Sequence, residues 1–255
     1  SVSWLTPRMD SIFVESPGAR RRFLDRLVIA FDPAHIGRTN RYDKLFRERA
    51  TLLAEGRVDE AWFTAIEASL AESAIAVTAA RQALIADLNA EAGDGWFGFP
   101  GAQLALDGTI ETWLADGSAL EAEDRFVAAA RSRREAGDTT IAGPHASDMT
   151  ARNSQTGGPA HLASTGQQKA ILIAVVLAHA RLQSRRLARP PILLLDDVVA
   201  HLDQARRQAL FDAVEAVGGQ AWFSGTDRDD FDGLSAQTMA ICARDGFARI
   251  TQSED

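Results

Sequence analysis

The sequence predicts an α/β protein in which a parallel sheet is packed by helices and a helical-hairpin arm is inserted. Three observations support this class: an apolar run at 192–195 that ends in two carboxylates, an almost wholly apolar segment at 170–180, and helical spacing of apolar residues across 39–92. A short apolar run of this kind is typical of a buried parallel strand. A helix that is apolar all round is expected to be buried.

The first elements are expected to be the end of a strand at residues 3–5 and a helix that begins at Ser16-Pro17. Serine is favoured as an N-cap, and proline is favoured at the first helical position. Arg20, Arg21 and Arg22 lie in the first turns, where positive charge opposes the helix dipole. They are either DNA or phosphate contacts or a solvated run paired with Asp25 or Asp10, and the sequence leaves both interpretations open.

Residues 39–56 and about 59–92 have helical spacing, separated by a turn at Gly56. At 1.5 Å per residue the second helix would span about 50 Å. The apolar pattern is too irregular for a long supercoil. We therefore expect a short hairpin arm at residues 39–93, with a plain helical subdomain as the alternative.

The remaining elements follow in chain order. A Gly-rich segment at 93–101 is expected to return the chain to the sheet. Strands are predicted at 104–106, 110–114, 139–142 and 221–224, helices at about 121–134 and 204–217, and a hairpin at 237–250. His145 follows the third of these strands, and it is either a structural histidine or a contact to a nucleotide or a neighbouring subunit.

The two carboxylates after the apolar strand are the first candidate site. Ligands of open α/β sheets bind beyond the carboxyl ends of the strands, where Asp196 and Asp197 lie. Hydrolysis of a phosphoanhydride needs a carboxylate to hold Mg²⁺ and a second group to orient the attacking water. A metal would also relieve the repulsion between the two charges. The alternative is a strand that simply runs into a polar loop.

The turn at Ser164, Thr165, Gly166 and Gln167 is the second candidate site. It opens the apolar helix, whose free N–H groups and positive dipole end suit an anion. Lys169 lies in the first turn of this helix, where a cation needs a nearby anion to offset the dipole. The alternative is a capped core helix with no ligand.

Taken in order, these motifs resemble the RecF family of bacterial replication and repair ATPases, which are related to the SMC proteins. The resemblance rests on Trp4–Pro7, Ser16-Pro17 with Arg20–Asp25, Asp32-Pro33, Gly143-Pro144-His145, Ser164–Lys169 as a signature motif, Leu193–Asp197 as a Walker B motif and Leu202-Asp203 as a D-loop. It implies an ABC-ATPase-like head, the C-lobe of a P-loop NTPase. On this basis residues 1–38 belong to the head, 39–93 form the arm, and 94–255 form the head C-lobe.

The resemblance also implies a function. ATP and Mg²⁺ would lie between two heads, with Asp196 on the metal, Asp197 polarising water, and Ser164, Gly166 and Gln167 clamping the γ-phosphate bound by the partner head. The further nucleotide contacts that it implies are Thr165, Lys169, Asp203 and Thr226, with Asp227 as the alternative to Thr226. The implied partners are DNA, an ATP-dependent homodimer, RecR, RecO and the RecA pathway, at gapped or stalled DNA in recombinational repair and the SOS response.

The chain departs from the family pattern in several places. No Gly-x-x-x-x-Gly-Lys-Ser/Thr loop occurs, so we expect a fragment that is inactive as an ATPase by itself. Ala163, Ala146-Ser147 and Ala200-His201 replace the usual residues of the signature, the Gly-Pro-His block and the D-loop. Two alternatives remain: another SMC-type or transporter-type ATPase, and a non-hydrolysing interaction module.

Composition limits the partners and the compartment. The net charge is -8 and the pI is about 5.2, which disfavours unaided charge-driven DNA binding. The single cysteine, Cys242, excludes an internal disulfide and fits a reducing cytoplasm. The segment 170–180 is too short to span a bilayer, and no secretory signal is recognisable.

Overall fold

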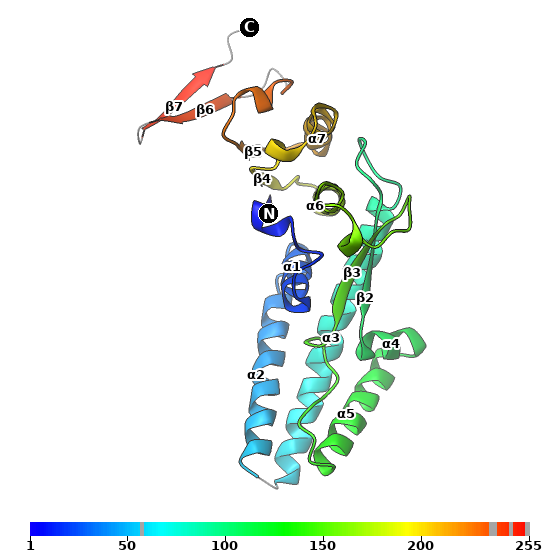
Figure 1. Ribbon diagram of the computed structural model, residues 1–255. Coiled ribbons are helices and arrows are strands. Elements are labelled where there is room, and N and C mark those ends of the chain that lie inside the picture. Colours follow the sequence, from blue (N-terminus) through cyan, green and yellow to red (C-terminus); the bar gives the residue numbers. More distant parts are fainter. Residues whose placement is uncertain (57–58, 235–238, 245–246, 253–255) are drawn as a thin grey trace.

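The computed structural model describes residues 1–56, 59–234, 239–244 and 247–252. A head and a long arm make up this part of the chain (Figure 1). The head contains β1 (Val2–Leu5), β4 (Ile192–Asp196) and β5 (Ala221–Ser224), with α6 (Thr165–Leu187) and α7 (Gln204–Val217). The arm contains α2 (His35–Ala54) and α3 (Glu60–Ala92). This arrangement confirms the α/β class with a helical arm.

The head sheet is parallel and has the strand order β1-β4-β5. Leu5 pairs with Leu195, and Asp196 pairs with Ser224, so the carboxyl ends of the strands meet at one edge. The long apolar helix α6 packs on one face of this sheet, and fifteen of its residues are buried. The predicted buried helix and parallel strand pairing are therefore present.

The 192–195 strand, expected to be buried, is buried on one face only. Leu193 and Leu195 are buried, whereas Ile192 and Leu194 are 37% and 40% exposed. Among the described residues helices cover only one face, and side chains alternate between the faces along a strand. The uncovered face, called here the bare face, consists of Val2, Trp4, Ile192, Leu194 and Trp222.

Helix α1 (Pro17–Ile29) joins the head to the arm and begins where the sequence predicts. The Ser16 Oγ accepts the Ala19 N–H at 3.3 Å, and Pro17 is the first helical residue. An antiparallel pair, β2 (Ala102–Asp107) and β3 (Asp148–Asn153), packs beside the upper half of α3. The Asn89 side chain of α3 holds β2 by hydrogen bonds to both the N–H and the C=O of Leu104.

The arm is more than a two-helix hairpin. Helices α4 (Thr109–Asp116) and α5 (Ala119–Glu135) pack against α3, and a second hydrophobic core joins them to α2. Its buried members include Tyr42, Phe63, Leu70, Ile110 and Phe126. Helices α4 and α5 thus pack into the same core as α2 and α3, although they follow β2 in the chain.

Two predicted strands are wrong. Residues 110–114 form α4, whose apolar residues 110, 113 and 114 have helical spacing. Residues 139–142 form no strand, because the Asp138 carboxylate accepts both the N–H and the hydroxyl of Thr140 and makes a turn. The strand of this region is β3, which begins at Asp148, six residues after the end of the predicted strand.

The C-terminal hairpin is confirmed as β6 (Met239–Arg244) and β7 (Phe247–Gln252), and its predicted turn at 245–246 lies outside the described residues. Helix α3 meets the length and composition of a membrane span, and among the described helices it is the one that does so. More than half of its most apolar window is buried against other elements. It crosses both hydrophobic cores, with Leu84 and Leu88 in the head core and Phe63 and Leu70 in the arm core.

Candidate functional site

The two carboxylates lie at the carboxyl edge of the head sheet. Asp196 is the last residue of β4 and is exposed, and Ser224 at the end of β5 donates its hydroxyl to Asp196 Oδ1 at 2.5 Å. The Asp197 N–H is shared between the Ser224 carbonyl and hydroxyl oxygens, both at 3.2 Å. Sequence analysis missed Ser224, although its place as the last residue of the neighbouring predicted strand was a usable signal.

Asp197 has a left-handed backbone, with φ at +53°. Aspartate tolerates this region better than most residues, but the conformation still costs about 1 kcal/mol or more. The following residues, Val198 and Val199, enter the head core and hold the turn in place. Conformations of this kind cluster at functional sites, which makes Asp197 the stronger candidate for a direct chemical role.

This edge fits Mg²⁺ held mainly by phosphates. Within the described ranges no group of three or more His, Cys, Asp or Glu side chains could hold a metal by itself. Mg²⁺ ordinarily keeps several waters and takes one or two carboxylates together with substrate phosphates. The exposed Asp196 carboxylate with the Ser224 hydroxyl is a donor set of that type.

The signature turn forms a capping box, which confirms Ser164 as the N-cap of α6. The Ser164 Oγ accepts the Gln167 N–H at 3.4 Å, and Gln167 Oε1 accepts the Ser164 N–H at 3.1 Å. The helix itself supplies no acceptor for the N–H groups of Thr165 and Gly166, and both residues are exposed. These two donors are available to an anion, while the Ser164 and Gln167 side chains hold the turn.

Lys169 does not face this turn. Its side chain is buried, and Nζ lies 3.2 Å from Asp10 Oδ2. Asp10 is thus the anion that the sequence analysis required near this lysine. The predicted nucleotide contact of Lys169 does not fit its position, because the ammonium group is turned into the protein.

Buried polar contacts hold the middle of α6 against α1 and β1. The His179 Nε2–H donates to the Leu27 carbonyl at 3.0 Å, and Gln183 Nε2 donates to Ser3 Oγ at 2.8 Å and approaches His179 Nδ1 at 2.9 Å. Burial lowers the pKa of His179 to about 4, so the ring is neutral at pH 7. The network fixes the helix that carries the signature turn.

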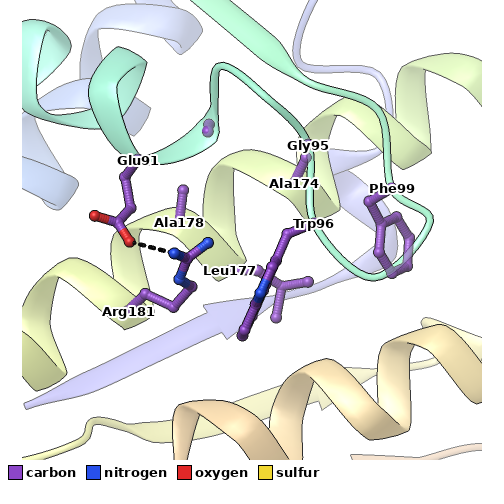
Figure 2. Close-up of a pocket in the computed structure, with 9 residues that line it drawn as sticks. Glu91, Gly95, Trp96, Phe99, Ala174, Leu177, Ala178 and Arg181 are labelled. Carbon is purple, nitrogen blue, oxygen red and sulfur yellow. Dashed lines mark ion pairs between the residues drawn. The ribbon is translucent and has the colours of Figure 1, made fainter.

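The Gly-rich segment 93–101 is held against the C-terminal half of α6. Figure 2 shows the Arg181 guanidinium between Glu91 and Trp96. It lies 2.8 Å from Glu91 Oε1 and 4.3 Å from the centre of the Trp96 ring. The cavity lined by these residues has room for about one water, with a volume of about 10 Å³. It is a packing contact with no space for a ligand.

The D-loop residue Asp203 and the predicted switch residue Thr226 lie on two different elements. Asp203 is the N-cap of α7, and its Oδ1 accepts the Arg206 N–H at 2.8 Å. Thr226 is exposed on the loop after β5, and Asp227 accepts the Asp229 N–H. The structure thus brings Asp196, Asp197 and Thr226 to the sheet edge and places Asp203 and Arg206 at the start of α7. The side chain of His201 lies outside the described residues.

The arginines of α1 have different surroundings. Arg20 makes a two-pronged ion pair with Asp148, with both distances 2.7 Å, and Arg21 donates to the Ser147 carbonyl at 2.7 Å. The predicted partners Asp25 and Asp10 are therefore wrong for Arg20. Arg22 is exposed, so it is the member of the triplet best placed to meet an external phosphate.

His145 has a structural role between the head and the arm. The Tyr42 hydroxyl and His145 Nδ1 form a hydrogen bond of 2.6 Å, and burial lowers the pKa of His145. A Cβ at Gly143 would lie 2.0 Å from the Tyr42 oxygen, so only glycine fits there. Arg81 of α3 binds the Pro144 carbonyl at 2.7 Å and both carboxylate oxygens of Asp25 at 2.8 Å.

Comparison with known proteins agrees with this architecture. No protein-family model matches the chain. The solved structure of the recombination mediator protein RecF with ATPγS in the RecFOR pathway superposes with a TM-score of 0.77 at 20% identity, over 98% of this chain and 67% of that one. The fold and the carboxylate edge therefore define an ABC-ATPase-like head with a helical arm.

Sequence relatives identify the family. The chain is 42% identical over 260 residues to the DNA replication and repair protein RecF of Mesorhizobium japonicum, covering 98% of this chain and 68% of the relative. It is 43% identical over 252 residues to the protein of the same name from Rhizobium meliloti, covering 96% and 67%. The chain belongs to the RecF family of DNA replication and repair proteins, and it spans about two thirds of the length of these relatives.

Proposed function

We propose that this chain is the signature and Walker B part of a RecF-type ATPase head, which closes as a homodimer around ATP and holds DNA. The observation that carries the proposal is the pairing of two features in one head. One is the open signature turn with the free N–H groups of Thr165 and Gly166, and the other is the Asp196–Ser224 edge. Such a head can hold Mg²⁺ with its own nucleotide at the sheet edge, and it can offer the signature turn to the nucleotide bound by its partner.

In this proposal each of these residues has a separate role. Asp196, with the Ser224 hydroxyl beside it, holds Mg²⁺, which when bound neutralises charge on the phosphates. Asp197 orients the attacking water, and Thr226 lies on the loop that follows Ser224. The Thr165 and Gly166 N–H groups contact the γ-phosphate from the partner side, with Ser164 and Gln167 keeping the turn in shape.

The bare face also supports this placement. Parallel sheets are ordinarily covered on both faces, and this one exposes five large apolar side chains, two of them tryptophans. Because the chain spans about two thirds of its relatives, we propose that a P-loop lobe of the longer protein covers this face. That lobe would bring the nucleotide to the sheet edge next to Asp196.

DNA binding would use local positive charge, since the chain carries a net charge of -8. Arg22 is exposed and free to reach a phosphate, while Arg20 and Arg21 are engaged with Asp148 and Ser147. We place the protein in the bacterial cytoplasm, acting with RecR, RecO and the RecA pathway at gapped or stalled DNA during repair and the SOS response. This biology rests on the family relationship.

The test uses the full-length protein that carries this chain. ATP-dependent dimerisation is measured by sedimentation velocity, and DNA binding by fluorescence anisotropy, for the native protein, Asp197→Asn and the exposed-carboxylate control Asp232→Asn. We expect ATP to drive dimerisation of all three and to trap only Asp197→Asn as a DNA-bound dimer. If ATP changes neither assembly nor DNA binding of the native protein, the non-hydrolysing interaction module replaces this proposal.

A further inference from the structure

We infer that Arg206 is a further nucleotide-binding residue, which contacts the γ-phosphate of the ATP bound by the partner head. The inference rests on the proposed function and adds to it a residue that the signature motif does not contain. Arg206 belongs to α7, thirty-seven positions after Lys169, the cation that the sequence places in the signature helix.

The position of Arg206 follows from the cap of α7. Asp203 caps this helix through the Arg206 N–H, so Arg206 stands in the first turn and its side chain reaches toward the start of α6. Around Gly166 the surface is open, and a Cβ built there would meet only Arg206, with Nη1 at 4.0 Å. The Arg206 guanidinium thus lies next to Gly166, one of the two residues of the signature turn with a free N–H.

The electrostatics of this position are unfavourable without an anion. Arg206 stands in the first turn of α7 and next to the start of α6, so two positive helix ends surround a third positive group. Its ion pair with Asp203 is loose, at 3.8 Å between Nε and Oδ2, which is beyond hydrogen-bond distance. A phosphate between the guanidinium and the signature turn would satisfy all of these groups together.

Other cations near the turn are already engaged. Lys169 is buried against Asp10, and Arg207 pairs with Asp230 on the other side of α7. Arg206 keeps 41% of its side chain exposed and is therefore accessible to a phosphate that arrives from a second head. Removing its side chain breaks no hydrogen bond of the described structure and loses only the loose ion pair with Asp203, because the cap uses the backbone N–H.

The first test measures the ATP concentration that gives half-maximal dimerisation of the full-length protein. Arg206→Ala should raise it by roughly ten- to a hundredfold, the range expected for a hydrogen bond to a charged group, and Arg206→Lys should lie between. The exposed control Arg189→Ala, two residues beyond the C-terminal end of α6, should match the native protein. The melting temperature without nucleotide should be the same for all four proteins.

The second test asks whether Arg206 acts across the interface. Mixing Arg206→Ala protein with Asp197→Asn protein creates heterodimers in which one of the two ATP sites has all its native residues. We expect ATP hydrolysis to reappear in the mixture, although each variant alone has little. A residue that acted within its own head would leave both sites of the heterodimer impaired, and no activity would return.

The outcomes separate the two proposals. If the native protein does not dimerise with ATP, the proposed function fails and the role of Arg206 fails with it. If the native protein responds to ATP and Arg206→Ala behaves like Arg189→Ala, only the inference about Arg206 is overturned. If Arg206→Ala is impaired but the mixture recovers no hydrolysis, the contact across the interface is wrong.

Discussion

The two faces of the head sheet are built from the same kinds of residue and have opposite surroundings. On the face that packs against α6 and α7, Leu5, Leu193 and Leu195 are at most 3% exposed. On the bare face Trp4, Leu194 and Trp222 are between 38% and 48% exposed. The difference shows that the described residues complete one layer of the head, while the composition of the strands suits a sheet covered on both sides.

The covered face also fixes the position of the signature turn. Helix α6 is held to this face by the buried His179–Gln183–Ser3 contacts and by the Lys169–Asp10 pair. The signature turn at its start therefore has a defined position relative to the sheet edge.

Truncation of neighbouring leucines should separate the two faces most clearly. Leu195→Ala should lower the free energy of unfolding of this chain by about 2–5 kcal/mol, because it leaves a cavity under α6. Leu194→Ala, one residue earlier on the bare face, should cost less than about 1 kcal/mol. Chemical denaturation measures both values, and equal losses would show that the two faces do not differ in packing.

Acidification should weaken the covered face through His179. Its folded pKa is about 4, below the ordinary histidine value of 6.5, so the stabilisation is complete above pH 6.5 and is lost as the pH falls toward 4. At pH 5 this predicts a loss of about 2 kcal/mol relative to pH 7.5. Urea titrations at the two pH values measure it, with His179→Gln expected to remove most of the pH dependence.

The Lys169–Asp10 pair should contribute a smaller amount at the edge of the same face. Its lysine side chain is 5% exposed and its aspartate 30%, so solvent screens part of the interaction. A double-mutant cycle with Lys169→Met and Asp10→Asn should give a coupling energy of about 1 kcal/mol. A coupling near zero would mean that Lys169 is free for another partner, such as a nucleotide.

Substitution on the bare face should have the smallest effect on the stability of this chain. Trp222→Ser should change the free energy of unfolding by less than about 0.5 kcal/mol, because nearly half of the side chain is exposed. It should also reduce the binding of a hydrophobic dye to the native chain. In the full-length protein the same change should be clearly destabilising, and the absence of that contrast would contradict a lobe that covers this face.

Local signals accounted for much of the fold. The caps at Ser16 and Ser164, the strand that ends at Asp196 and the helix that follows Asp203 all appear where the sequence places them. Residues 110–114 were misassigned because a short segment with Trp and Ile suits a strand by composition, although packing against α3 made it a helix. The packing of α4 and α5 against the arm helices has no local signal either, since these helices join the arm core only in three dimensions.

The class of the protein, the order of its motifs and the ends of its main helices could be predicted from the chain alone. These depend on hydrogen bonds and apolar spacing within a few residues, which a single chain segment carries in full. Only the tertiary structure decided that Ser224 supports Asp196, that Lys169 pairs with Asp10, that Arg20 pairs with Asp148 and that Arg206 stands beside Gly166. These partners lie between 28 and 159 positions apart, and burial and charge select them only after the strands and helices have packed.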